Sequence, residues 1–124
     1  VDIMYAERAG VVDACREKGI LAFGNVNDMN KEENGTDVVV TSALWHMESA
    51  INHAISLTKA GNFKAEEYHH WTMMAKGGAS LAPYYEFEDK VPGSVKSQVA
   101  SLASDITAGK FTVEIIDSEP KSTF

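Results

Sequence analysis

The spacing of hydrophobic and polar residues predicts an α/β protein, beginning with a strand, a helix and a second strand. Apolar side chains recur on one side of residues 9–18, which predicts a helix that Gly19 ends. The continuous apolar run at residues 20–23 predicts a strand buried on both faces, and residues 2–5 are typical of an earlier short strand. Two strands joined through a helix form a βαβ unit, so we expect them to be parallel.

The middle of the chain predicts two more strands and a longer helix. Residues 25–37 are polar and contain the turn dipeptide Asn34-Gly35, after which the β-branched residues 38–40 predict a third strand. Residues 44–60 carry apolar side chains at helical spacing, and Gly61 follows them as a stop signal. Residues 68–74 are aromatic and predict a fourth strand.

The last third of the chain predicts one amphipathic helix and a final strand. Apolar residues in this region repeat at intervals of four, three and four, between Pro92 and Gly109. Residues 111–115 alternate as in a strand, and residues 117–124 are expected to be frayed. No internal repeat or linker divides the chain, so residues 1–124 are expected to form a single unit.

Residues 76–85 combine a glycine pair, a hydroxyl, a proline and two tyrosines. This composition is too irregular for a helix and too rich in glycine for a plain strand. It predicts backbone that lies close to another strand or to a ligand.

Composition and charge narrow the function classes. The chain has 124 residues, is 44% hydrophobic and carries a formal net charge of −7. The excess of acidic residues argues against a surface that binds nucleic-acid phosphates, so we expect no nucleic-acid partner. The single cysteine, Cys15, lies in the apolar pattern of the first helix and is expected to be buried rather than bonded.

Metal binding and catalysis find little support in the sequence. His46 and His53 are seven residues apart, about 10 Å along a helix, and His69 and His70 would point to opposite faces of a strand. We therefore expect no metal and no cofactor. Ser80 has no histidine or acid that the sequence ties to it, so we expect a binding protein without catalytic residues rather than an enzyme.

Three residues at predicted strand ends have the chemistry to bind a ligand. Because ligands sit beyond the carboxyl ends of parallel strands, residues 24–28 and 41–45 are candidate site segments. Asp28 could accept hydrogen bonds from a ligand or cap a turn or helix, and both remain open. Trp45 could stack on a ring or anchor a helix to the core, and Tyr84 carries the same ambiguity.

Four segments, taken in order, resemble one protein family. They are residues 10–19 (GVVDACREKG), residues 22–28 (AFGNVND), Thr41-Ser42 after a strand, and residues 77–84 (GGASLAPY). These segments are similar in sequence to the C-terminal half of the basic membrane protein family. These bacterial lipoproteins are substrate-binding proteins of ABC importers, and several of them bind purine nucleosides.

The resemblance implies a parallel-sheet lobe of the type I periplasmic-binding-protein fold, with the N-terminal lobe largely absent. It implies a purine-like nucleobase or nucleoside as ligand in a cleft between lobes and an ABC transporter permease as partner. The expected location is outside the cytoplasm, either periplasmic or lipid-anchored at the membrane. The alternatives are a ligand sensor or regulator that keeps this fold without transport, or, with less support, an α/β enzyme.

The resemblance also implies ligand contacts. Asp28 falls on the family's aspartate for sugar hydroxyls, and the expected ligand-binding residues are Asp28, Asn27, Trp45, Lys76 and Tyr84. The family's ligand lysine falls on Ala75, one residue before Lys76, and a shift of one in an extended segment turns a side chain to the other face. A free base stacked on Trp45 is therefore the favoured ligand.

Overall fold

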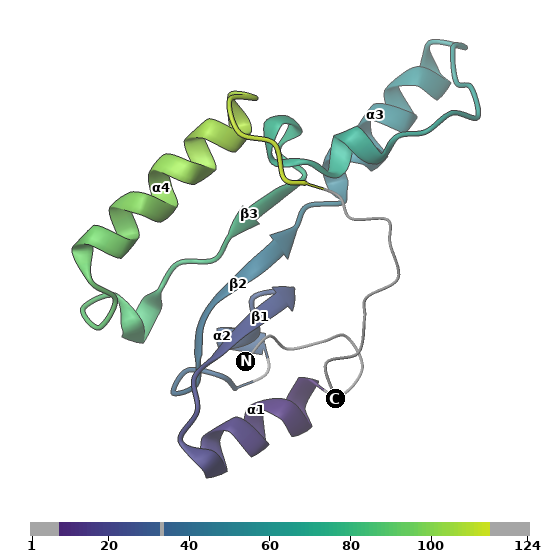
Figure 1. The fold of residues 1–124 in the computed structure, drawn as a ribbon. Helices are drawn as coiled ribbons and strands as arrows, with labels where there is room; N and C mark the ends of the chain where they lie inside the picture. Colours follow the sequence, from purple (N-terminus) through teal and green to yellow (C-terminus); the bar gives the residue numbers. More distant parts are fainter. Residues whose placement is uncertain (1–7, 33, 115–124) are drawn as a thin grey trace, which may run out of the picture.

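The computed structural model describes residues 8–32 and 34–114, and it confirms the α/β class (Figure 1). The longer elements are α1 (Arg8–Lys18), β1 (Ala22–Val26), β2 (Val39–Trp45), α3 (Glu48–Lys59), β3 (Ala79–Leu81) and α4 (Gly93–Thr107). The short elements are α2 (Met29–Glu32) and the 3₁₀ turns η1 (His69–Thr72), η2 (Met74–Lys76) and η3 (Tyr85–Phe87). The predicted strand at residues 2–5 and the predicted frayed tail at residues 117–124 lie outside the described residues.

The strands form a mixed sheet of three, in the order β1-β2-β3. β1 runs parallel to β2, with Val26 opposite Leu44, and β3 runs antiparallel to β2, with Ala79 opposite Trp45. Ala22 pairs with Val39 while Gly24 pairs with Ser42, so β2 carries one extra residue between these pairs. Such a bulge changes which face the following side chains occupy.

The core lies between α1, α2 and the first two strands. Its buried members are Val12, Cys15, Ala22, Met29, Val38 and Val39. Cys15 is therefore buried, as the apolar pattern predicts. A side chain at Gly24 would collide with Met29 and Ser42, so the glycine allows α2 to pack directly on the sheet.

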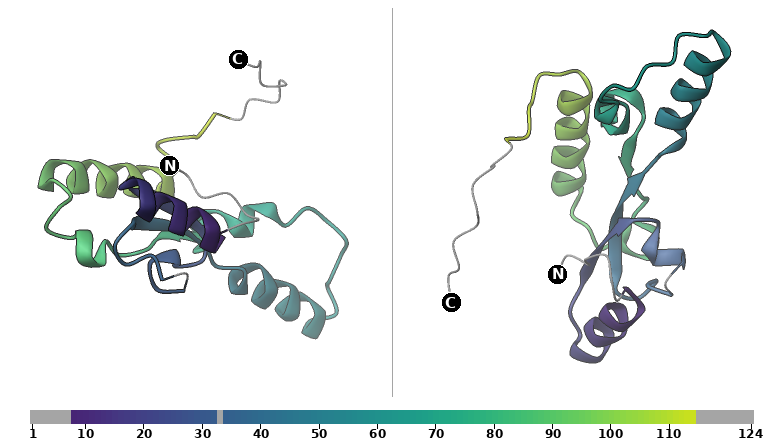
Figure 2. Two further views of the ribbon diagram at one scale, coloured as in Figure 1. Left: turned by 90° about the horizontal axis from the view of Figure 1, so that it is seen from below. Right: turned by 90° about the vertical axis from the view of Figure 1, so that its right-hand side faces the viewer.

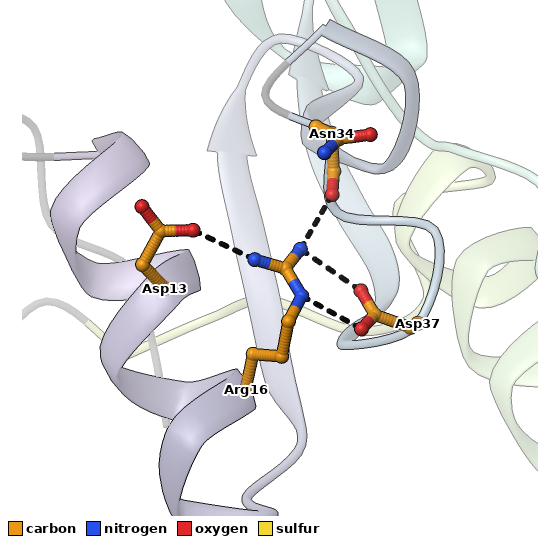
Figure 3. A network of polar contacts seen from close by, with 4 residues as sticks. All are labelled: Asp13, Arg16, Asn34 and Asp37. Carbon is orange, nitrogen blue, oxygen red and sulfur yellow. Dashed lines mark hydrogen bonds and ion pairs between the residues drawn. The ribbon is translucent and has the colours of Figure 1, made fainter.

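Arg16 fastens α1 to the segment that leads into β2 (Figure 3). Its guanidinium donates two hydrogen bonds to the Asp37 carboxylate, at 2.7 and 2.9 Å, one to Asp13 and one to the Asn34 carbonyl. The hydrogen bond from Arg16 is the main reason that the pKa of Asp37 lies below its usual value. This bidentate geometry is the strong form of an arginine–carboxylate contact.

Helices α3 and α4 lie outside this core. Neither contains a buried residue. α4 lies on one side of the strands and α2 on the other, as the right-hand view of Figure 2 shows. α3 extends away from the sheet together with the loop that follows it (Figure 1).

All three predicted helices are confirmed, with corrected ends. α1 ends before Gly19 and α4 before Gly109, and both glycines adopt positive φ angles of 63° and 70°. The helix predicted for residues 44–60 begins only at Glu48, because Leu44 and Trp45 belong to β2. The strand predicted for residues 20–23 begins at Ala22, and Phe23 is 51% exposed, so this strand is not buried on both faces.

The fourth predicted strand, at residues 68–74, is wrong. These residues form η1 and the start of η2, and Trp71 stacks on His53 of α3 with ring centroids 3.9 Å apart. The strand that pairs with β2 in this part of the chain is β3, at residues 79–81. It runs antiparallel to β2, so the sheet is mixed and not parallel as predicted. Residues 111–114 form no strand, and Ile115 lies outside the described residues.

The glycine pair at residues 77–78 does bring backbone close together, as expected. A Cβ atom at Gly78 would collide with the backbone of Trp71 and Thr72. Gly77 has a φ of 71°, a conformation that suits glycine and ends η2. The two glycines therefore turn the chain tightly from η2 into β3.

Candidate functional site

A strained turn after β1 positions the polar residues of the site. Val26 has a φ of 73°, which is unusual for a β-branched residue. The Asn27 N–H donates to the Asn25 carbonyl, and the Met29 N–H donates to the Asn27 carbonyl. Backbone strain of this kind persists where the surroundings hold it, often at binding sites.

Asp28 contacts Tyr85 through its side chain. The Tyr85 hydroxyl donates a 2.6 Å hydrogen bond to Asp28 Oδ2, across 57 positions of sequence. Asp28 Oδ1 is buried and has no hydrogen-bond partner among the described residues. The Asp28 carbonyl accepts from the N–H groups of Lys31 and Glu32, so its backbone, and not its carboxylate, begins α2.

Asn30 repeats this situation two residues later. Its side chain is almost fully buried, and Nδ2 donates to the Val39 carbonyl at 3.0 Å and to Glu86 Oε2 at 3.3 Å. Asn30 Oδ1 is buried without a partner among the described residues. Two acceptor oxygens next to η3 are thus unsatisfied, and each such atom is costly unless a donor reaches it.

The electrostatics keep Tyr85 a hydrogen-bond donor. Its pKa lies above the usual value, first because its hydroxyl donates to Asp28, then because of burial and the negative charge of Asp28. The Lys31 ammonium lies 4.3 Å from the centre of the Tyr85 ring, within the range of a cation–π contact. The tyrosine is therefore protonated at neutral pH and donates its only hydroxyl proton to Asp28 Oδ2. The acceptors Asp28 Oδ1 and Asn30 Oδ1 still lack a donor among the described residues.

A separate apolar groove lies between α4 and β3. Its main cavity has a volume of about 410 Å³ and is lined by residues 80–84 and by α4 residues such as Val99 and Ala103. An adjoining hollow of about 260 Å³ shares Ser80, Leu81 and Ala103. Neither space is lined by Asp28. The groove is therefore distinct from the polar cluster, which consists of Asp28, Asn30, Tyr85 and Glu86.

The residues predicted to bind ligand do not share one site. Asp28 lies in the polar cluster and Asn27 in the turn that precedes it. Tyr84 lines the α4 groove, and the Lys76 ammonium lies 5.1 Å from the centre of the Trp71 ring. Trp45 pairs with Ala79 at the end of β2 and is 54% exposed, so it anchors no helix in the core.

Two residues of the cluster are missing from the sequence prediction. In the sequence, Tyr85 could equally bind a ligand or pack in the core, as Tyr84 could. Its position at the start of η3, with a φ of 45°, brings its hydroxyl to Asp28. Asn30 falls in a polar stretch that reads as a turn. Its burial depends on the packing of α2 against β2, which no local pattern reports.

Ser80 has a histidine beside it. His46 Nε2 lies 2.7 Å from Ser80 Oγ, and His46 Nδ1 lies 3.6 Å from Glu48 Oε1. The second distance exceeds a hydrogen bond. Ser80 also lies inside β3, opposite Leu44, and not on the sharp strand-to-helix turn that presents a nucleophilic serine.

The described residues contain neither a metal-ligating group of side chains nor a helix that could span a membrane. Within residues 8–32 and 34–114, no three His, Cys, Asp or Glu side chains gather in a group that could hold a metal ion. No helix in this part of the chain has the length and apolarity to cross a membrane.

Comparison with solved structures shows a likeness in fold. No family model matches the sequence, and no curated protein matches it significantly. A solved structure described as a transcriptional activator of the comK gene from Bacillus halodurans is similar, with a TM-score of 0.63 and 24% sequence identity. The likeness covers 83% of this chain and 34% of that chain, so this chain spans about a third of its length. At this identity, the likeness shows the fold.

These findings correct several expectations. The assignment to the basic membrane protein family is wrong, since the similar structure is described as a transcriptional activator. Four expectations that depended on this assignment are wrong for the same reason: the importer function, its purine-like ligand, the lipoprotein character and the permease partner. The same likeness overturns the expectation of no nucleic-acid partner.

Proposed function

We propose that this chain is the ligand-sensing part of a transcription regulator. The fold resembles that of a transcriptional activator over 83% of the chain. The observation that carries the sensing role is the pair of buried, unpartnered acceptor oxygens on Asp28 and Asn30. A regulator that responds to a small molecule needs such a site, because the ligand must bind one conformation better than another.

The chemistry of the site selects a ligand with hydrogen-bond donors. Asp28 Oδ1 and Asn30 Oδ1 can both accept hydrogen bonds and have no donor among the described residues. A compact polyol or amine supplies donors to both oxygens. An anionic ligand is disfavoured, because Glu86 lies beside Asn30.

The length of the similar solved chain is compatible with a larger, two-lobed protein. The similar solved chain is about three times as long as the part that this chain matches. We propose that the described α/β unit is one lobe of a fold of the periplasmic-binding-protein type. A ligand at Asp28 would then lie where lobes meet, and its binding would change how they pack.

We propose that the chain is not an enzyme. Support comes from the 3.6 Å separation of His46 and Glu48 and from the position of Ser80 within a regular strand. A serine nucleophile needs a base that is itself oriented by a hydrogen-bonded acid.

Thermal-shift screening and calorimetry with neutral polyols, amines and carboxylates test the sensing role. The matched variant is Asp28→Asn, which keeps an acceptor for Tyr85 but replaces the second oxygen with an amide donor. We expect polyol or amine binding to weaken at least tenfold in this variant, the effect of losing a charged hydrogen bond. Equal binding by both proteins would refute the role of Asp28.

Transcript profiling tests the regulatory role separately. Cells that lack the full-length protein should change the expression of a small set of genes, and Asp28→Asn should make that set insensitive to the ligand. Unchanged transcripts in the deletion strain would overturn the regulator assignment. The location outside the cytoplasm stays a prediction of the sequence resemblance, and it conflicts with a regulator that binds DNA. Cell fractionation with an antibody to this chain decides between the two locations.

A further inference from the structure

The outer side of α3 carries an exposed apolar stripe. Met47, Ile51 and Ile55 recur every four residues from the helix start and are 46%, 53% and 46% exposed. Residues at this spacing form one row along a helix. The opposite side of α3 is used within the chain, where His53 stacks on Trp71 and Ser49 donates to the Lys76 carbonyl.

The two ends of this stripe carry opposite charges on the same flank. Glu48 begins α3 and Lys59 ends it, and both are exposed. They are separated by about 16 Å along the axis and by only about 20° around it, from the rise and turn of an α-helix. A row of apolar side chains therefore runs beside an acidic start and a basic end.

This arrangement is complementary to itself when two helices run antiparallel. An antiparallel pairing that sets Ile51 opposite Ile55 of a second copy sets Glu48 beside Lys59 of that copy. The two-fold axis then creates the same charge pair again at the other end. A two-fold interface requires a self-complementary patch, which most surfaces lack.

We propose that α3 docks antiparallel against α3 of a second copy of this chain. The apolar stripe supplies the buried centre and the two Glu48–Lys59 pairs fix direction and register. The helix has 12 residues, about 18 Å of length, so the contact is small and the association weak. α3 projects from the sheet, which leaves this side open to a second copy (Figure 1).

Charge reversal with sedimentation equilibrium tests the pairing. Over about 10 μM to 1 mM, a range suited to a weak interface, we expect the unaltered protein to form dimers. Glu48→Lys or Lys59→Glu alone should weaken dimerisation about tenfold, because each creates two like-charge contacts. The double variant E48K/K59E should restore it, because the two charges then pair in reverse.

Matched variants on α1 separate a specific contact from a change in net charge. Glu17 and Lys18 are exposed, and Glu17→Lys and Lys18→Glu change the charge of the chain by the same amounts. Both should leave dimerisation unchanged, and Ile51→Lys should abolish it. A monomer throughout the range, a dimer that survives Ile51→Lys, or a double variant that stays as weak as the single ones would each overturn the proposal.

Discussion

Gly24→Ala should destabilise the protein by opening the packing between β1 and α2. The added Cβ would overlap Ser42 Oγ and lie 2.9 Å from Met29 Cβ. Both neighbours are fully buried, so neither side chain has free space to move into. Ser42 Oγ also accepts a 3.2 Å hydrogen bond from the Met29 N–H, which the displacement would break.

The expected cost of this substitution combines two effects. Overpacking a close-packed core costs about 1–3 kcal/mol. The lost Ser42 hydrogen bond adds about 0.5–1.5 kcal/mol, because the Met29 N–H still donates to the Asn27 carbonyl and is not left unsatisfied. We expect Gly24→Ala to lower the free energy of unfolding by about 2–4 kcal/mol.

Urea unfolding followed by far-ultraviolet circular dichroism measures this loss, as a midpoint lower by on the order of 1–2 M. Gly10→Ala is the matched control, because a Cβ there meets nothing within 4 Å and the residue lies inside α1. That change should stabilise by about 0.5–1 kcal/mol. The double variant G24A/S42G should recover part of the loss. An unchanged midpoint in Gly24→Ala would refute the close packing.

Three further outcomes are expected. The raised pKa of Tyr85 contributes stability that is fully present below pH 10 and is lost as pH rises through the folded-state pKa. Tyr85→Phe should therefore remove this alkaline loss from urea midpoints, and Tyr84→Phe should not. The lowered pKa of Asp37 contributes stability above about pH 4 that is lost as pH falls through the folded-state pKa. Asp37→Asn should flatten that acid limb, and so should Arg16→Met, which removes the guanidinium that lowers the pKa. Ser80 should resist a fluorophosphonate probe, measured by mass spectrometry, and labelling that depends on the neighbouring histidine would contradict the non-enzyme proposal.

The sequence predicted Asp28 as a site residue but not its partner Tyr85 or the buried Asn30. Asp28 stands out because it follows a predicted strand by a short polar turn, a place that local pattern does report. Tyr85 is 57 positions away and comes to Asp28 only through the η3 turn. The family resemblance pointed to Lys76 and the predicted strand end to Trp45, and the fold places both away from Asp28. A resemblance in short segments does not carry the contacts between them.

The sequence alone determined the local elements of this protein. The glycines after α1 and α4 and the apolar repeats within them set both helices, because these signals act through hydrogen bonds and contacts a few residues apart. Tertiary structure decided the rest. Residues 68–74 have strand-like composition, yet stacking of Trp71 on His53 holds them in 3₁₀ turns. β3 is a strand because β2 offers it an edge, and Asn30 is buried because α2 packs there. Contacts between distant segments outweigh local propensities of a few tenths of a kcal/mol per residue.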